Sequence, residues 1–236
     1  MSTHGFKREL KYYINTFDYY SLNSRLKAFL SNDPNADKNG EYSIRSLYFD
    51  DVNNSGLCEK LGGVKSRSKY RIRIYNRSDN LIKLEKKIKV DDMTRKDVEL
   101  ISRDDYEKIV GGNVSFLKSS GDELLVEFYQ KYLNVLLRPR VIVDYVRDAY
   151  VVRGGHVRIT FDKHLRTGLS STDLFGNNVP FVRVLEAGYM ILEIKYDDFL
   201  PDYIRNSVQL CDRNRFSISK YALCRNYSKA NIWEEN

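Results

Sequence analysis

The sequence predicts an α+β domain in which an antiparallel barrel, or a strongly curved sheet, carries helices on its apolar outside. Three observations support this fold class. Strand patterns outnumber helix patterns in the 236 residues. Most strands alternate charged and apolar residues, whereas buried parallel strands have continuous apolar runs. Charges of both signs gather on one face of five strands, which we interpret as a sheet that curls its charged face inward.

Eight segments have the alternation, or the β-branched and aromatic content, that is typical of strands. They span residues 6–14, 42–49, 69–75, 81–90, 97–101, 140–151, 156–161 and 190–196. Turn signals rich in Gly, Asn and Asp separate them at 77–80, 154–155 and 175–178.

Five of these strands have a charged face, because successive side chains point to opposite sides of a strand. The charged sets are Glu9 and Lys11; Lys69, Arg71 and Arg73; Lys83, Glu85, Lys87 and Lys89; Arg158, Thr160 and Asp162; and Glu193 and Lys195. Apolar residues fill the intervening positions, and only Lys86 breaks the pattern. A lumen lined in this way is suited to bind a polyanion, and its carboxylates are suited to hold the metal that accompanies one.

Five segments have helical patterns, at 18–30, 103–110, 122–137, 201–210 and 216–226. In the first, Tyr19, Leu22, Leu26 and Phe29 recur at helical spacing. We expect Ser102 to cap the N-terminus of the second helix, and Pro139 to end the third helix. We expect these helices to cover the outer, apolar face of the barrel.

Composition indicates one large domain, residues 1–236, with a hydrophobic fraction of 42%. The net charge of +7 favours anionic partners. Cys58, Cys211 and Cys224 are too few and too far apart for a disulfide framework. No apolar run is long enough to span a membrane, and the charged N-terminus does not resemble a secretory signal. We therefore expect a cytoplasmic protein without a membrane segment.

Two short motifs carry the chemistry that a phosphate ligand needs. Arg71 and Arg73 follow Lys69 on one strand face, and guanidinium groups bind phosphate oxygens bidentately, although a solvated basic strand has the same pattern. Glu193 and Lys195 place a carboxylate beside a cation. This pair is either a surface ion pair or a metal-binding Glu next to a phosphate-binding Lys.

Near the C-terminus, Ser219 is positioned to cap the helix that follows, and Lys220 then lies at the helix N-terminus. A cation is unfavourable there unless an anion such as a phosphate offsets it. Several enzyme classes are excluded, because the chain has no P-loop, no dinucleotide fingerprint and no nucleophile elbow. The three histidines, His4, His156 and His164, show no metal-ligand spacing.

Eight motifs in order along the chain carry a family resemblance. They are Arg8-Glu9-Leu10-Lys11-Tyr12-Tyr13, Ser46-Leu47-Tyr48-Phe49-Asp50-Asp51, Tyr70-Arg71-Ile72-Arg73, Leu84-Glu85-Lys86-Lys87, Arg138-Pro139-Arg140-Val141, Arg158-Ile159-Thr160-Phe161-Asp162, Leu192-Glu193-Ile194-Lys195 and Ser219-Lys220-Tyr221. The series resembles the polyphosphate polymerase domain of the vacuolar transporter chaperone (VTC) family, in its stand-alone bacterial form. That family belongs to the triphosphate tunnel metalloenzymes, which include CYTH-type domains. The resemblance implies an antiparallel eight-stranded β-barrel tunnel with flanking helices.

The resemblance also implies roles for thirteen residues. Lys220, Arg71, Arg73 and Lys195 would be catalytic. Phosphate contacts would come from Lys11, Lys69, Lys87, Lys96, Arg147, Arg158 and Ser219. Glu193, with Glu9, would hold a divalent metal, Mn²⁺ or Mg²⁺. Related hydrolases carry Glu-x-Glu-x-Lys on the first strand, whereas Lys7 stands here in place of the first carboxylate, which suits the polymerase branch.

The implied function is ATP-dependent polyphosphate synthesis, with the ATP γ-phosphate transferred to a growing chain. ATP and inorganic polyphosphate would be the partners. Two alternatives stay open: a triphosphatase of the same fold that uses water as the acceptor, and a non-catalytic polyphosphate-binding or nucleic-acid-binding module. The carboxylates Glu85, Asp162 and Glu193 on the basic faces argue against nucleic acid. Product length, preferred metal, primer requirement and oligomeric state stay open.

Overall fold

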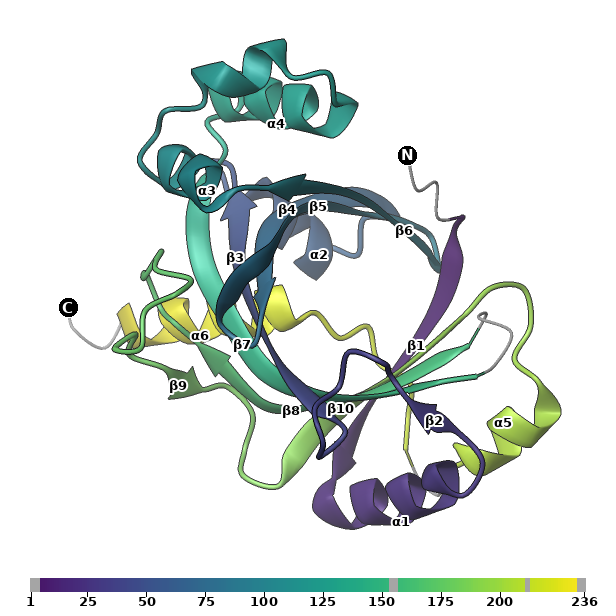
Figure 1. The fold of residues 1–236 in the computed structure, drawn as a ribbon. Helices are drawn as coiled ribbons and strands as arrows, with labels where there is room; N and C mark the ends of the chain where they lie inside the picture. The colour runs from purple at the N-terminus through teal and green to yellow at the C-terminus, as the bar shows by residue number, and fades with distance from the viewer. Residues whose placement is uncertain (1–4, 153–156, 211–212, 233–236) are drawn as a thin grey trace.

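The computed structural model describes residues 5–152, 157–210 and 213–232, and a closed barrel of eight antiparallel strands dominates it (Figure 1). Around the ring, the strands follow the order β7-β3-β4-β5-β6-β1-β10-β8, and β8 pairs back with β7. Their bounds are β1 Lys7–Asn15, β3 Glu41–Asp50, β4 Ser66–Tyr75, β5 Ser78–Val90, β6 Met93–Ile101, β7 Arg138–Val151, β8 Arg158–Thr167 and β10 Tyr189–Tyr196. Two short strands, β2 (Ser31–Asn32) and β9 (Val182–Arg183), pair with β7 and β8 outside the ring.

The eight predicted strands each overlap one strand of the ring, so the predicted barrel is confirmed. One turn prediction is partly wrong. The β4–β5 hairpin turns at Asn76 and Arg77, and β5 already begins at Ser78. Both turn residues have positive φ, 51° and 57°, as a two-residue hairpin with the twist of its strands requires. The predicted turn at 154–155 and the residues His4, His156 and Cys211 lie outside the described residues.

The ladders that join neighbouring strands of the ring differ in length. β1 pairs with β10 over eight residues, from Arg8↔Tyr196 to Asn15↔Tyr189. On its other side, β1 pairs with β6 only through Lys7↔Thr94 and Arg8↔Met93. The barrel is therefore closed, and the β1–β6 junction is its shortest ladder.

One side of the barrel is covered by α3 (Arg103–Val110), a 3₁₀ turn (Ser115–Ser119) and α4 (Glu123–Asn134). Phe128 of α4 packs its ring against Phe49 and Tyr70, with centroids 5.2 and 5.8 Å away. Lys86 also points to this side, where it donates to Glu127 of α4 at 2.6 Å. This helix therefore explains the single break in the alternation of β5.

The opposite side is covered by α1 (Thr16–Lys27) and α5 (Asp202–Ser207). Leu22, Leu26 and Ile204 are fully buried there against the outward residues of β1, β8 and β10, such as Phe161. Asn15 caps α1, because its side chain accepts from the backbone N–H of Asp18. The predicted helices are thus present, and the bounds of α3, with its Ser102 cap, are confirmed.

Two helices contradict the expectation that helices lie only outside the barrel. α2 (Ser55–Leu61), which the sequence analysis missed, and α6 (Lys220–Ile232) lie across one end of the ring (Figure 1). Tyr221 of α6 stacks on the inward-facing Tyr48 at 5.2 Å. The buried carboxylate of Asp50 joins both helices to β3, because it accepts from the Gly56 and Leu57 N–H groups and from the Tyr221 hydroxyl. No helix of the described residues is long and apolar enough to cross a membrane.

Candidate polyanion site in the barrel lumen

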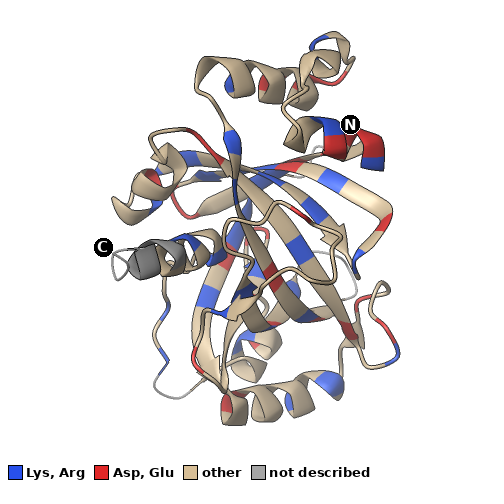
Figure 2. Cartoon of the chain, turned by 90° about the vertical axis from the view of Figure 1, so that its left-hand side faces the viewer, with Lys and Arg blue, Asp and Glu red and all other residues tan. Residues whose placement is uncertain are grey.

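The lumen is a single cavity of about 1180 Å³ with a strongly basic lining. Seventeen described Lys and Arg residues line it against four carboxylates, Glu9, Asp33, Asp92 and Glu193, which is far more positive charge than one triphosphate needs for neutralisation. Figure 2 shows Lys and Arg positions spread along successive strands of the barrel. All thirteen residues assigned from the sequence line this cavity: Glu9, Lys11, Lys69, Arg71, Arg73, Lys87, Lys96, Arg147, Arg158, Glu193, Lys195, Ser219 and Lys220.

Strand alternation produces this lining. On β4, Tyr70, Ile72 and Ile74 lie in the outer core, so Lys69, Arg71 and Arg73 face the lumen. The register of β4 with β5 then sets Arg71 opposite Glu85 and Lys69 opposite Lys87. Cations of neighbouring strands therefore meet inside the barrel, where only bound anions or internal carboxylates can offset them.

Glu85 is the first internal carboxylate, and no part of it is exposed. The Arg71 Nε donates to it at 2.6 Å and the Lys96 Nζ at 2.8 Å. Burial raises the pKa of Glu85, but Arg71, Arg73 and Lys96 outweigh burial and hold this pKa well below its usual range. Arg71 also donates to the Tyr48 hydroxyl at 2.7 Å. Glu85 thus fixes two cations whose remaining N–H groups are available to a ligand.

Asp162 is the second internal carboxylate. Arg147 binds it bidentately, with Nε and a terminal nitrogen at 2.6 and 2.8 Å, and Lys220 pairs with it as well. Burial raises the pKa of Asp162, but Arg147 and Lys220 lower it further than burial raises it. The carboxylate stays ionised and orients both cations toward the cavity.

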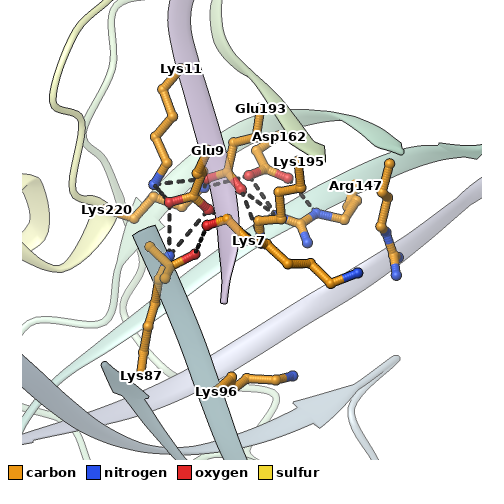
Figure 3. A network of polar contacts seen from close by, with 12 residues as sticks. Lys7, Glu9, Lys11, Lys87, Lys96, Arg147, Asp162, Glu193, Lys195 and Lys220 are labelled. Carbon is orange, nitrogen blue, oxygen red and sulfur yellow. Dashed lines mark hydrogen bonds and ion pairs between the residues drawn. The ribbon is translucent and has the colours of Figure 1, made fainter. Parts of the chain in front are cut away.

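Glu9 and Glu193 lie at the centre of the network, with Lys11, Lys87, Lys195 and Lys220 around them (Figure 3). Lys87 donates to Glu9 at 2.9 Å, and Lys195 lies 3.3 Å from Glu9. Lys220 contacts Glu193, and Arg147 lies 3.5 Å from it. Burial raises the pKa of each glutamate, and the surrounding lysines outweigh it, so both pKa values lie well below the usual range.

At the α2 end of the lumen, cations gather without internal carboxylates. We call Lys60, Arg67, Lys69 and Lys89 the unpaired cation cluster, because no carboxylate of the described residues forms an ion pair with them. Lys69 donates to the Ser219 hydroxyl at 3.1 Å and lies over the Tyr221 ring. Burial first, and then Arg67, Lys87 and further cations, lower the pKa of Lys69 to about 7. The charge of such a cluster suits an anion that is not part of the protein.

At the other end of the lumen, Arg158 donates to the Tyr42 hydroxyl at 2.6 Å and pairs with Asp33. Lys83 lies there over the Tyr75 ring. Because one cavity is lined both by these residues and by the unpaired cation cluster, its cations extend from one end of the barrel to the other.

Lys220 is the first residue of α6, and Ser219 caps the helix by accepting from the Ala222 N–H at 3.3 Å. The cap agrees with the sequence analysis. The offsetting anions at this helix start are Asp162 and Glu193, which the sequence analysis did not foresee. Burial lowers the pKa of Lys220, but these two carboxylates raise it further, so its ammonium stays charged.

Sequence reasoning placed Glu85 and Asp162 on charged faces but did not identify the cations that they bind, because those cations come from other strands and from α6. It also missed Lys60, which lies on α2, and the lumen hydroxyls of Tyr48 and Tyr145. Tyr145 accepts from Arg73 at 3.3 Å, and Val143, Tyr145 and Arg147 alternate on β7, which is the signal that could have found it.

The residues present fit a divalent metal in one place. Within the described parts of the chain, no group of three or more His, Cys, Asp or Glu is placed to hold a metal ion. Glu9 and Glu193, however, present neighbouring carboxylates to the cavity. Mg²⁺ and similar hard cations bind through one or two carboxylates together with substrate phosphates. This pair therefore suits a metal that is shared with a phosphate ligand.

Comparison with known families gives one match. The profile of the family described as VTC domain matches residues 6–228, which is nearly the whole chain. No curated protein sequence matches the chain.

A comparison with solved structures gives several similar chains. One is a putative adenylyl cyclase, HpAC1, from Hippeastrum, described as having a dominant triphosphatase activity; it is 13% identical, has a TM-score of 0.54, and the match covers 94% of this chain and 95% of that one. A putative adenylate cyclase from Bacillus halodurans is 13% identical with a TM-score of 0.47, covering 85% and 86%. A Pyrococcus horikoshii OT3 protein is 11% identical with a TM-score of 0.47, covering 92% and 98%. At these identities, the likeness to the Hippeastrum protein shows a shared fold, the triphosphate tunnel.

Proposed function

The chain belongs to the VTC domain family, and from this premise we propose that it is an ATP-dependent polyphosphate polymerase. It transfers the γ-phosphoryl group of ATP to the end of a polyphosphate chain held in the lumen. ADP and a chain longer by one phosphate are the products. The predicted cytoplasmic location belongs to the same proposal.

The main support for this proposal is the length of the row of cations that lines the lumen. The lumen-facing residues of β5 alone run from Lys83 to Lys89, which spans about 20 Å of strand. At one end of this row lies the unpaired cation cluster, to which Lys89 belongs and which adds Lys60, Arg67 and Lys69 to the lining. A growing polyanion uses this extra length, whereas hydrolysis of one triphosphate does not need it.

Transfer of a phosphoryl group demands mainly positioning and neutralisation of charge on the phosphate oxygens. Arg71 and Arg147 meet these demands, because hydrogen bonds to Glu85 and Asp162 hold each guanidinium group in place. Arg73 and Lys195 add charge beside them, and Lys220 approaches from α6. In this proposal, incoming phosphate oxygens replace water around these cations while the two internal carboxylates stay paired.

Glu193 and Glu9 would hold the divalent metal, Mn²⁺ or Mg²⁺, and it would supply further charge neutralisation on the transferred group. Their low pKa values keep both carboxylates ionised. Lys195 lies 3.3 Å from Glu9 and 3.8 Å from Glu193, so phosphate and metal sites adjoin.

A triphosphatase is the second candidate. The activity reported for the Hippeastrum protein of the same fold favours it. The same cations would bind the triphosphate, and water would be the acceptor in place of a chain end. The two candidates differ in where the phosphoryl group goes.

The test therefore measures which molecule receives the phosphoryl group of ATP. Purified protein is incubated with ATP and Mn²⁺, ADP and orthophosphate are both quantified, and the products are separated on a gel for polyphosphate. A polymerase releases ADP without equal orthophosphate and makes long chains. Equal amounts of ADP and orthophosphate without polymer indicate the triphosphatase, and the absence of any turnover indicates a binding module.

The metal assignment has its own variant in this assay. Glu193→Gln keeps the side-chain shape and removes the charge, so we expect metal-dependent turnover to fall by a factor on the order of 100 or more. Asp91→Asn is the matched control, because Asp91 is exposed and pairs with Lys65 outside the lumen. Turnover of Glu193→Gln equal to that of the control would remove Glu193 from the metal site.

A further inference from the structure

Lys11 occupies the position between the two carboxylates that suit a metal. Its Nζ lies 3.3 Å from Glu9, 3.4 Å from Glu193 and 3.2 Å from the carbonyl oxygen of Ile218, to which it donates. An ammonium has three N–H donors, and here three oxygens surround it. The set of oxygens that could receive a divalent cation is thus already satisfied by a cation of the chain.

The β1–β10 register brings the residues of this arrangement together. Lys11 lies directly opposite Glu193, and Glu9 lies directly opposite Lys195. Two positive and two negative groups therefore alternate on four adjacent positions of one inward face, and such cross-strand neighbours interact directly. The Lys11 side chain is only 13% exposed, so little solvent screens its contacts with the two glutamates.

The local charge around the two glutamates is positive. Lys11, Lys87, Lys195 and Lys220 contact Glu9 or Glu193, and Arg147 contacts Glu193. Five cations thus surround two carboxylates in a region of low exposure. A divalent cation that enters alone meets this excess of positive charge, whereas one that enters with a phosphate chain does not.

We propose that Lys11 is the resident cation of the Glu9–Glu193 pair and makes divalent-metal binding conditional on a phosphate chain. The inference rests on the proposed metal role of these carboxylates. Phosphates take over the lysines as counterions, and the freed carboxylate oxygens then bind Mn²⁺ or Mg²⁺. By linkage, metal and phosphate chain raise each other's affinity by the same factor.

The first arm of the test uses Mn²⁺ alone, in buffer without phosphate, and measures free Mn²⁺ by electron paramagnetic resonance. The wild type should bind Mn²⁺ weakly, and Lys11→Gln should bind one Mn²⁺ at least about tenfold more tightly. Adding Glu193→Gln to that variant should abolish the gain. Lys65→Gln is the control, because Lys65 is 86% exposed and pairs with Asp91 outside the cavity.

The second arm needs no variant. Water-proton relaxation, which detects Mn²⁺ bound to a slowly tumbling protein, should rise when tripolyphosphate is added to wild type with Mn²⁺. A wild type that binds Mn²⁺ alone as tightly as Lys11→Gln would overturn the inference, as would a folded Lys11→Gln variant that gains no binding. If tripolyphosphate does not raise the relaxation signal of the wild type, Mn²⁺ binding is not conditional on a phosphate chain. These outcomes do not depend on polymer formation, so a failure of the polymerase proposal is seen separately on the gel.

Discussion

At the scale of single residues, the lumen is a set of cations that internal carboxylates divide into two kinds. Arg71 and Arg147 are held by Glu85 and Asp162, which have no exposed surface and leave the guanidinium edges toward the cavity. Lys69 has no such partner among the described carboxylates, and burial and the neighbouring cations lower its pKa to about 7. Lys87 donates to Glu9, yet burial lowers its pKa to about 7 as well.

Lys220→Ala should abolish polyphosphate formation while ATP still binds more weakly. One lost charge-assisted contact corresponds to about 1.5–3 kcal/mol of binding free energy, and the other cations of the lumen remain. Turnover is more sensitive, because a contact that strengthens in the transition state acts on the rate directly. Calorimetry with ATP and a product gel provide the two measurements.

The control for Lys220 is Lys65→Ala, which removes a lysine whose side chain is 86% exposed outside the cavity. Long chains made by Lys220→Ala at the rate of this control would show that Lys220 has no part in the reaction.

Lys69 gives a prediction on pH. Its pKa of about 7 means that above neutral pH the side chain is largely uncharged in the empty lumen. A bound phosphate favours the charged form, so tripolyphosphate binding at pH 8 should take up a proton at Lys69 and should weaken as pH rises from about 7 to 9. Calorimetry in two buffers of different ionisation enthalpy measures this uptake.

Tripolyphosphate also exchanges protons itself, and the comparison with Lys69→Met removes that contribution. The wild type should take up about one more proton at pH 8 than the variant does. Equal proton numbers for the two proteins would show that Lys69 keeps its charge in the empty lumen.

At the scale of elements, the strands followed from the sequence more completely than the helices. Alternation of charged and apolar residues, or β-branched and aromatic content, indicated the eight ring strands, and the apolar face of several packs beneath helices. The sequence analysis missed α2, because a helix of seven residues with only Leu57 buried has no apolar periodicity to detect. The start of α6 was placed too early, since residues 216–218 run extended along β1, where the Phe216 N–H donates to the Lys11 carbonyl.

The anchoring of α6 can be tested through Tyr221. Tyr221→Phe removes a hydroxyl that donates to Asp50, a buried carboxylate that also holds the start of α2. We expect a loss of about 1–2 kcal/mol in the free energy of unfolding, measured by urea denaturation.

Tyr20→Phe is its control, because Tyr20 is 66% exposed and should change stability by less than about 0.5 kcal/mol. If the two variants unfold at the same urea concentration, the Tyr221–Asp50 contact does not anchor the end of the barrel.

At the scale of the whole molecule, the sequence was sufficient for the fold class, for the inward charged face and for a lumen that holds all thirteen assigned residues. It was not sufficient for the pairing inside the lumen. Lys96 with Glu85, Lys69 with Ser219 and Lys11 with Glu193 are contacts that only barrel closure and strand register decide. A net charge of +7 on a closed barrel thus becomes a basic tunnel in which the ionised carboxylates of Glu9, Glu85, Asp162 and Glu193 hold set positions.

The most direct measurement of the central claim is an experimental structure of the protein with tripolyphosphate and Mn²⁺, using anomalous scattering to locate the metal. The account predicts phosphates inside the barrel against Arg71, Arg73 and Arg147, the Glu85 and Asp162 ion pairs intact, and Mn²⁺ between Glu193 and a phosphate oxygen. Phosphate bound only on the outer surface, with the lumen lysines still paired to Glu9 and Glu193, would contradict it.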